Sequence, residues 1–552
     1  MRRIGFSQPW IAPTIVWLAA GAAYWLAVAW VRAYSPEWIF DGFKLRPDGS
    51  DSAWQTIRLW EMWVVGPRTL WDMHVYPPLY DALRYLLMQP ETLAGQSPDA
   101  LAVDQRLYVI NSMLFGLVAM VVYLWVRDLT GSGWWGLVGA TLWTAIPASL
   151  AYMSLLSQPG PAIAAMAVAF YLLYRFSRTR RYTYLAGFLS ALLIASLTRN
   201  VVQIHVLAVL IIAAVGMWWI TRNRRAWMLV VNIGFIALIA FWPLRTYALY
   251  ATFDVSTHTG YNRAGALWIN PTSVPELIPE SVKRQYEEYT ASAQALRDPT
   301  ILAELTPDEV QELRVDFSQQ EQEWSVTKQS YPGVDFESVG VYPDRLIENS
   351  QRLSSGWNTP ELLLGNYRLG RAANTFILEQ PIEATAAALR SLQITVPTIF
   401  RSVDVQWYNG FSKTFPLSGP LDSIFSGWRF AVLIGLSIAI ILGHYGIAKS
   451  GRLLVRYGWF AVFWLLTLLP VLLSNRYWPP EIPEPTHSEA DRLRALVDVP
   501  VYVLMTFAAF LVTRRIINAL RVSRRDAPDS DSALMNRKDR LGTSATIDPE
   551  TR

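Results

Sequence analysis

Apolar residues occur along the chain in long runs, separated by short polar stretches and by a few much longer ones. Each run is near the roughly 20 residues that an α-helix needs to cross the hydrocarbon core of a bilayer. Trp30 and Arg32 follow the first run where a signal peptide would have small residues, so we expect a retained span. The pattern predicts ten membrane spans, near residues 12–32, 107–126, 134–155, 161–175, 183–197, 201–220, 226–248, 427–444, 457–474 and 498–513.

Basic residues gather in every second loop between the predicted spans. Ten alternating spans put these clusters on one face of the membrane, which the positive-inside rule makes the cytoplasmic face. We therefore expect an inner-membrane protein with both termini in the cytoplasm and with residues 33–106, 249–426 and 475–497 outside. The clusters comprise Arg2, Arg3, Arg175, Arg178, Arg180, Arg181, Arg222, Arg224, Arg225, Lys449, Arg452, Arg456, Arg514, Arg515, Arg521, Arg524 and Arg525.

Composition agrees with a membrane location. Of the 552 residues, 52% are hydrophobic and only 17% are charged, whereas soluble domains carry roughly 25% charged residues. The chain has no cysteine, which excludes disulfides, thiolate nucleophiles and cysteine-ligated metals. A net charge of +4 does not suggest a nucleic-acid partner, whereas a lipid bilayer is required. The expected fold class is an all-α polytopic membrane protein with interfacial helices and a large extracytoplasmic segment.

The same pattern divides the chain into four parts. Residues 1–250 form an N-terminal membrane module that contains the outer loop 33–106, and residues 251–425 form the extracytoplasmic segment. Residues 426–515 carry the last spans, and residues 516–552 form a cytoplasmic tail whose composition is typical of disorder. Within the outer segment, residues 276–323 contain 12 acidic and 4 basic residues and are expected to be solvated. Helices are expected over Pro307–Glu323 and Pro381–Val403, and no clear strand pattern is visible.

The first outer loop holds the most informative polar residues. Asp51 precedes an amphipathic stretch, residues 53–60, and a short acidic side chain there is typical of a helix N-cap. Asp48 belongs to the turn before it. A second amphipathic helix is expected to begin near Tyr76, because two prolines follow at its start. Two such helices at the membrane surface would hold an acidic residue at the interface.

The order of these features resembles the C-type (GT-C) glycosyltransferases, in particular the bacterial protein mannosyltransferase and lipid A aminoarabinose transferase branch. The resemblance covers roughly residues 1–250 and 425–515, and Tyr76 stands where that branch usually has histidine, with His74 two residues earlier. The residues that carry it are Asp51, Val75–Tyr80, Arg106, Pro147, Leu197–Asn200, Trp242–Tyr247, Ser488–Arg494, Asp498 and Pro500.

The resemblance implies an inverting transfer of a sugar from a polyprenyl-phosphate donor to a glycan, lipid or protein acceptor outside the membrane. A carboxylate near the acceptor hydroxyl would take its proton, and arginine donors or a divalent metal would stabilise the leaving phosphate. Asp51 is the expected general base, with Asp48 in reserve. The expected phosphate ligands are Arg245, Arg199 and Arg494, and the expected neighbours of donor or acceptor are His74, Tyr76 and Trp54.

Each of these residues also has a purely structural interpretation. Asp51 could be a helix cap, and Arg199 and Arg245 could anchor span ends at the headgroups. His74 has Asp72 and Asp81 nearby in sequence, but this loose spacing favours a hydrogen-bonded histidine over a metal ligand. Tryptophans such as Trp54 are typical of an interfacial aromatic belt.

Two other functions remain open from the sequence. A flippase or transporter would also suit ten spans, although transport usually needs polar groups at mid-membrane and the predicted span centres are almost uniformly apolar. An envelope assembly factor without catalysis would use the segment 251–425 to bind a partner. The identity of the sugar, the acceptor and any cofactor is not encoded in a visible motif.

Overall fold

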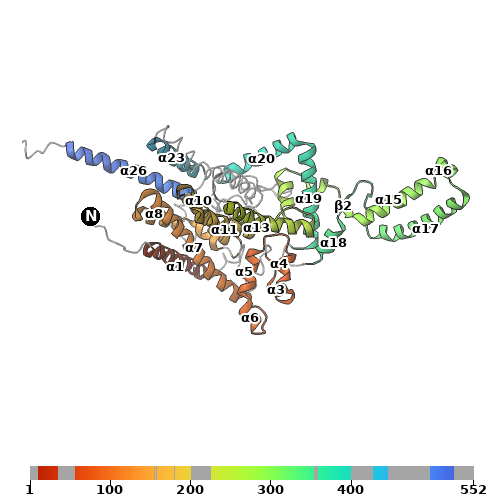
Figure 1. Cartoon of the computed structure of the whole chain (residues 1–552), viewed down its shortest axis with the longest axis horizontal. Coiled ribbons are helices and arrows are strands. Elements are labelled where there is room, and N and C mark those ends of the chain that lie inside the picture. The colour runs from red at the N-terminus through yellow and green to blue at the C-terminus, as the bar shows by residue number, and fades with distance from the viewer. Residues whose placement is uncertain are drawn as a thin grey trace, which may run out of the picture.

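The computed structural model describes residues 10–34, 56–154, 156, 158–179, 181–199, 226–352, 358–399, 427–445 and 498–526. These residues are mostly helical, and they include one two-stranded parallel sheet. A bundle of long helices forms the body of the molecule, and a helical arm projects from one end of it (Figure 1).

The bundle surrounds one large apolar core. Its central helix, α7 (Ala100–Thr130), packs against α1, α8, α10 and α26, and α10 packs in turn against α11. Buried aromatic and aliphatic side chains such as Phe115, Trp143 and Phe170 fill the space between these helices. The other helices of the bundle are α1 (Ile11–Tyr34), α8 (Gly133–Ala145), α9 (Pro147–Ser154), α10 (Pro159–Thr179), α11 (Tyr182–Thr198), α13 (Ala226–Tyr250), α23 (Gly427–Tyr445) and α26 (Val499–Asp526).

The number of spans differs from the expected ten. Within the described residues, five helices are long and apolar enough to cross a membrane, and they make this a multi-pass membrane protein. These candidate spans are Ile11–Trp30, Ala100–Thr130, Pro159–Thr179, Ile233–Tyr250 and Val499–Val522.

The missing spans have separate causes. The expected span 134–155 is broken, because the residue before Pro147 is extended and α8 ends at Ala145. The helix α11 has 17 residues, about 25 Å, which is shorter than the hydrocarbon core. In α23 the apolar stretch, Ala431–Tyr445, is also too short to cross the hydrocarbon core. The expected spans 201–220 and 457–474 lie outside the described residues.

Within the described residues 56–99, four short helices are present where the sequence predicts two. They are α3 (Leu59–Val65), α4 (Arg68–Asp72), α5 (Leu79–Leu87) and α6 (Gln89–Leu93). The predicted start of the second helix is confirmed, because Pro78 is the N-cap of α5. The predicted helix over residues 53–60 is wrong in its described part, since Arg58 is extended and the helix begins at Leu59.

Tertiary hydrogen bonds explain why the helix starts late. Arg84 Nη1 donates to the Ile57 carbonyl at 2.6 Å, and the Ile57 N–H donates to Asp81 Oδ1 at 3.3 Å. Arg84 and Asp81 also pair with each other at 2.7 Å, and both side chains are fully buried. The backbone of Ile57 therefore satisfies its polar groups on α5 and not within a helix of its own.

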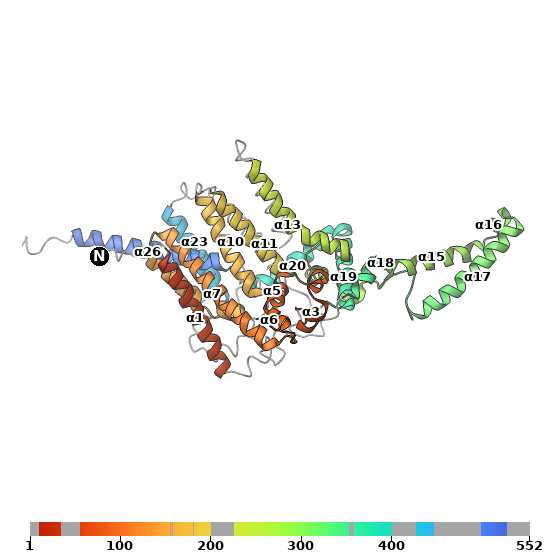
Figure 2. The same cartoon turned by 60° about the horizontal axis from the view of Figure 1, so that its bottom comes forward.

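The segment after α13 combines a compact base with a long helical arm. The arm consists of α15 (Glu280–Ala295), α16 (Pro299–Glu304) and α17 (Pro307–Gln329), and it extends away from the bundle in both views (Figures 1 and 2). The base contains α14 (Thr259–Ala266), a 3₁₀ turn (Pro271–Ser273), β1 (Leu277–Pro279), β2 (Gly340–Tyr342), α18 (Asp344–Ser350), α19 (Pro360–Glu379) and α20 (Pro381–Ile399).

The two helices predicted for this segment are confirmed. Both expected helices are present as α17 and α20, and α17 begins with a capping box in which Thr306 and Glu309 bond each other's backbone. The sheet was missed because its strands have three residues each, too few for an alternating pattern to show. At the other end of the chain, α26 continues past 515 to Asp526.

Candidate functional site

Residues 72–75, from the end of α4 onward, lie buried where α13 ends. Among the described residues no strand pairs with them, so their backbone polar groups need other partners. All four of their carbonyl groups accept hydrogen bonds from residues 245–257, far away in sequence. In chain order from Asp72 to Val75, the donors are the Tyr250 hydroxyl, Arg245 Nη1 (2.7 Å), the Thr257 N–H (2.8 Å) and the Ser256 hydroxyl.

A single amide completes the binding of this segment. Asn358 Oδ1 accepts from the N–H of His74 at 3.0 Å and from the N–H of Val75 at 3.1 Å. Because the oxygen is fixed by two donors, the orientation of the amide is fixed as well. Its Nδ2 atom is buried and has no hydrogen-bond partner among the described residues. We refer to residues 72–75 with these five partners as the clasp.

Arg245 has a second edge that the clasp does not use. The residue lies in the last turns of α13 and is 4% exposed. Its Cζ atom lies 4.6 to 5.6 Å from the ring centroids of Trp242, Tyr250 and Trp71, within the range of cation–π attraction. Its Nε and Nη2 atoms are buried, with no acceptor in hydrogen-bonding geometry among the described residues. A buried guanidinium with a vacant edge is costly without an anion.

The one carboxylate of the clasp is already engaged. Asp72 lies 3.3 Å from Arg68 Nε and 3.3 Å from Arg352 Nη1. Together with Arg245, these two arginines bring three positive charges to the site, against the single negative charge of Asp72. The site therefore carries a net positive charge and attracts an anion.

His74 is held neutral beside this arginine. Burial first, and then the positive charge of Arg245, lower its pKa to about 3 against the opposing effect of a backbone hydrogen bond to Asn358. Nδ1 lies 2.9 Å from the Thr257 hydroxyl, and the ring packs on Tyr250 with centroids 5.0 Å apart. Nε2 is buried without a partner among the described residues. This atom donates or accepts a hydrogen bond according to which ring nitrogen carries the proton.

Tyr76 lies beside a second buried polar residue, His258. Its ring lies 6.2 Å from that of His258, which stacks on Tyr261 at 5.5 Å. Nearby, Asp254 is almost fully buried, and burial raises its pKa to about 6 against the effects of the Val255 N–H and of Arg263. This carboxyl therefore changes charge close to neutral pH.

The sequence-predicted site residues fall into three sets. His74, Tyr76 and Arg245 are brought together by the clasp and its surroundings. Arg199 is buried at the C-terminal end of α11, a helix that packs on both α13 and α5. Asp48, Asp51, Trp54 and Arg494 lie outside the described residues.

A metal site is not visible in the described part of the chain. No group of three or more histidine, aspartate and glutamate side chains there lies close enough to hold a metal ion. Asp72 and Asp81, which are near His74 in sequence, instead pair with arginines.

Sequence reasoning missed most of the clasp. Ser256 and Thr257 belong to a run of hydroxyl-bearing residues that begins soon after α13, and this run was the available signal. Asn358 lies more than 280 positions from the residues whose N–H groups it accepts, and no local pattern marks it.

Comparison with known proteins does not assign this site. Protein-family models give no match to the chain, and curated proteins give none either.

Proposed function

We propose that this protein is a membrane glycosyltransferase that moves a sugar from a polyprenyl-phosphate donor to an acceptor hydroxyl on the extracytoplasmic side. The observation that carries the proposal is the vacant edge of Arg245, buried at the end of a candidate membrane span. Guanidinium groups bind phosphate through two parallel N–H bonds, and Nε with Nη2 forms such an edge. A lipid-linked phosphate would reach this edge from the bilayer while its tail stays among the spans.

The neutral donors of the clasp support the same ligand. Asn358 Nδ2 provides a further buried N–H group, and His74 Nε2 provides either a donor or an acceptor. A phosphate with an attached sugar offers acceptors in its oxygens and donors in its hydroxyl groups. The arrangement therefore suits a ligand that combines one anionic group with neutral polar ones.

The chemistry assigned to these residues is a displacement at the anomeric carbon. The acceptor oxygen attacks that carbon and transfers its proton to the Asp51 carboxylate. The bond to the phosphate oxygen breaks, and the phosphate leaves with the electron pair, which Arg245 stabilises. Asp48 remains the alternative base, and Arg199 and Arg494 remain further phosphate ligands. The basic loops at the opposite end of the bundle favour cytoplasmic termini and an inner-membrane location.

The test compares strains that lack the gene or carry the wild type, Asp51→Asn, Asp48→Asn or Arg245→Lys. Mass spectrometry of lipid-linked sugars and envelope glycans is the measurement. We expect a polyprenyl-phosphate sugar to accumulate, and one glycan to lose a residue, in the deletion and Asp51→Asn strains. Loss of a general base lowers the rate by about 10²–10⁴-fold. Arg245→Lys keeps the charge but loses the two-pronged edge, so partial accumulation is expected.

Two controls and two alternative outcomes complete the test. The melting temperature of each purified variant shows whether it folds, and Arg371→Lys is the matched arginine change away from the clasp, since Arg371 donates to the Val341 carbonyl. Normal transfer by a folded Asp51→Asn enzyme, with loss in Asp48→Asn, would move the base to Asp48. Unchanged lipid-linked sugars and glycans in the deletion strain would overturn the proposal and favour transport or assembly.

A further inference from the structure

The last helix has two halves with different surroundings. The first half of α26 is buried against α7 and α8, with Val499, Tyr502 and Leu511 almost fully covered. From Arg514 to Val522 every residue is exposed. Both views show α26 continuing past the bundle at the end opposite the helical arm (Figures 1 and 2). The exposed half is therefore a helix without a protein surface beneath it in the described residues.

Three of its exposed apolar residues share one face, whereas Ile517 and Val522 are exposed outside that face. Val512, Ile516 and Leu520 follow at intervals of four and form an aliphatic stripe, exposed at 38%, 54% and 61%. Arg514 and Arg521, seven residues apart, lie on the opposite side of the helix. Between residues 499 and 525 there is no acidic residue. The exposed half thus presents an aliphatic stripe and carries arginines without any acidic residue before Asp526.

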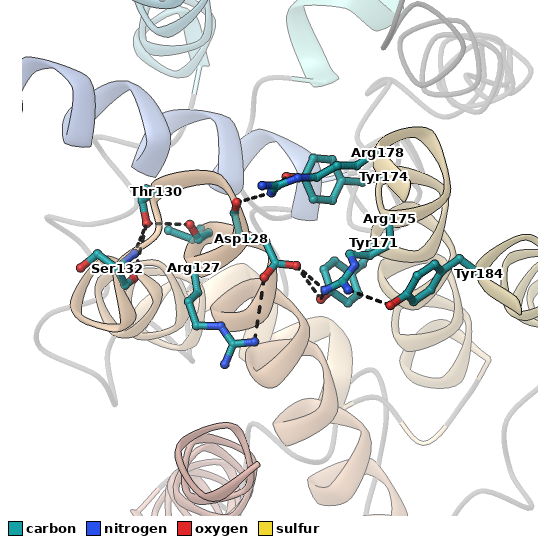
Figure 3. A network of polar contacts seen from close by, with 10 residues as sticks. Arg127, Asp128, Thr130, Ser132, Tyr171, Tyr174, Arg175, Arg178 and Tyr184 are labelled. Carbon is teal, nitrogen blue, oxygen red and sulfur yellow. Dashed lines mark hydrogen bonds and ion pairs between the residues drawn. The ribbon is translucent and has the colours of Figure 1, made fainter. Parts of the chain in front are cut away.

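The neighbouring helix ends add positive charge. Figure 3 shows the network around Asp128, whose carboxylate accepts from Arg175 at 2.6 Å and from the Tyr171 hydroxyl at 3.0 Å. Arg178 donates to the backbone carbonyl of Asp128, and Arg127 lies 3.9 Å from the carboxylate. The carboxylate of Asp128 thus faces two arginines and its backbone carbonyl binds a third, and α26 packs against both helices that carry them.

A ring contact places the exposed half at this same end. The Trp135 ring, just after the α7–α8 turn, lies 5.7 Å from that of Phe510. Arg515 Nη2 donates to the Gly443 carbonyl at 3.2 Å and ties α26 to the end of α23. The aliphatic stripe therefore begins where the bundle ends, and it occupies the last turns of the candidate span Val499–Val522.

We propose that the exposed half of α26 is a binding site for anionic phospholipid headgroups at the basic end of the bundle. Its aliphatic stripe packs on the upper acyl chains, and Arg514 and Arg521 hold headgroup phosphates. Charge identifies the occupant, because Arg514 and Arg521 have no acidic partner among the described residues, and arginines at the end of a membrane span pair with anionic headgroups. The site is independent of the clasp and of any transfer reaction.

The test uses the full chain, whose lack of cysteine allows single-cysteine labelling. Leu520→Cys reports on the stripe, Asn518→Cys on another side of the same turns, and Ala509→Cys on the span. Each variant carries a fluorophore and is reconstituted into phosphatidylcholine vesicles with or without phosphatidylglycerol. Quenching by neutral acrylamide measures exposure to water. We expect the Leu520→Cys probe to be shielded only in anionic vesicles and the Ala509→Cys probe in both.

Charge removal separates lipid binding from other causes of shielding. Adding Arg514→Gln and Arg521→Gln should weaken the shielded state about fivefold for each arginine. Arg284→Gln with Arg314→Gln, in the helical arm, is the matched control and should change nothing. Equal exposure in both kinds of vesicle would overturn the proposal. Shielding that is the same in both kinds of vesicle but increases with the protein-to-lipid ratio would also overturn it. That result would indicate contact with a second copy of the chain.

Discussion

At the scale of single residues, His74 shows how position changes chemistry. An exposed histidine titrates near pH 6.5, whereas burial beside Arg245 lowers the pKa of this one to about 3. Between these values the unfolded chain binds a proton that the folded chain excludes. The stabilisation that neutral His74 contributes is therefore complete above pH 6.5, and it is lost as the pH falls from 6.5 towards 3. Asp254, with its pKa raised to about 6, acts in the opposite direction.

We predict that His74→Gln removes much of the acid sensitivity of the fold. On going from pH 7 to pH 5, the wild type should lose about 2 kcal/mol more stability than the variant. Thermal unfolding of the detergent-solubilised protein at both pH values measures this difference. Asp254→Asn is the complementary variant and should lose more stability on acidification than the wild type. Identical pH dependence in all three proteins would contradict the assignment.

At the scale of helices, α1 and α7 are held together by close backbone approach. A Cβ atom added at Gly116 would lie 2.2 Å from the backbone oxygen of Trp17, a distance that real atoms do not reach. The Ser112 hydroxyl donates to the Gly21 carbonyl at 2.9 Å, a second close contact along the same seam. Only glycine at 116 allows this spacing, and the buried Tyr24 and Phe115 rings pack beside it, 5.2 Å apart.

We predict that Gly116→Ala destabilises the protein by about 1–3 kcal/mol, because α1 must move away from α7. Gly234→Ala is the matched control, since it also lies inside a bundle helix and a Cβ atom there meets nothing within 4 Å. That variant should be neutral or more stable, as alanine favours the helix. Melting temperatures of the two purified variants are the measurement, and equal shifts would show that the α1–α7 spacing is not limiting.

At the scale of the whole molecule, the clasp joins parts of the chain that are far apart in sequence. The first outer loop is bound by the end of α13, by residues 254–257 and by Asn358. The buried Asp81–Arg84 pair holds the same loop further upstream, at Ile57. The loop that leads from Asp51 is therefore fixed at two points against the rest of the structure.

We predict that Asn358→Ala loosens this connection. Two buried N–H groups, those of His74 and Val75, lose their acceptor, at a cost of about 1–3 kcal/mol each. Hydrogen exchange at these two amides should accelerate, while exchange in the bundle core stays slow. Asn374→Ala is the control, because the Asn374 amide oxygen accepts from the partly exposed Arg263 and not from a buried backbone N–H group. Unchanged hydrogen exchange at the His74 and Val75 amides would show that Asn358 does not hold this segment in place.

Local pattern was sufficient for most of the helices. The runs that give α1, α7, α10 and α13 are long and apolar, and the prolines at 78, 307 and 381 mark helix starts correctly. The pattern overstated the number of spans because hydropathy alone does not register the break before Pro147 or the short length of α11. It also could not show that Ile57 bonds to α5 rather than to its own neighbours.

The sequence by itself determined that this is a helical membrane protein, and it singled out His74, Tyr76 and Arg245. Both conclusions depend on neighbours within a few turns of helix or on the period of apolar residues. Only the tertiary structure decided which of these side chains meet. The clasp depends on hydrogen bonds between groups more than 170 positions apart, and the vacant edge of Arg245 exists because Met73 takes only one of its nitrogens. Such pairings arise from packing, which no local pattern encodes.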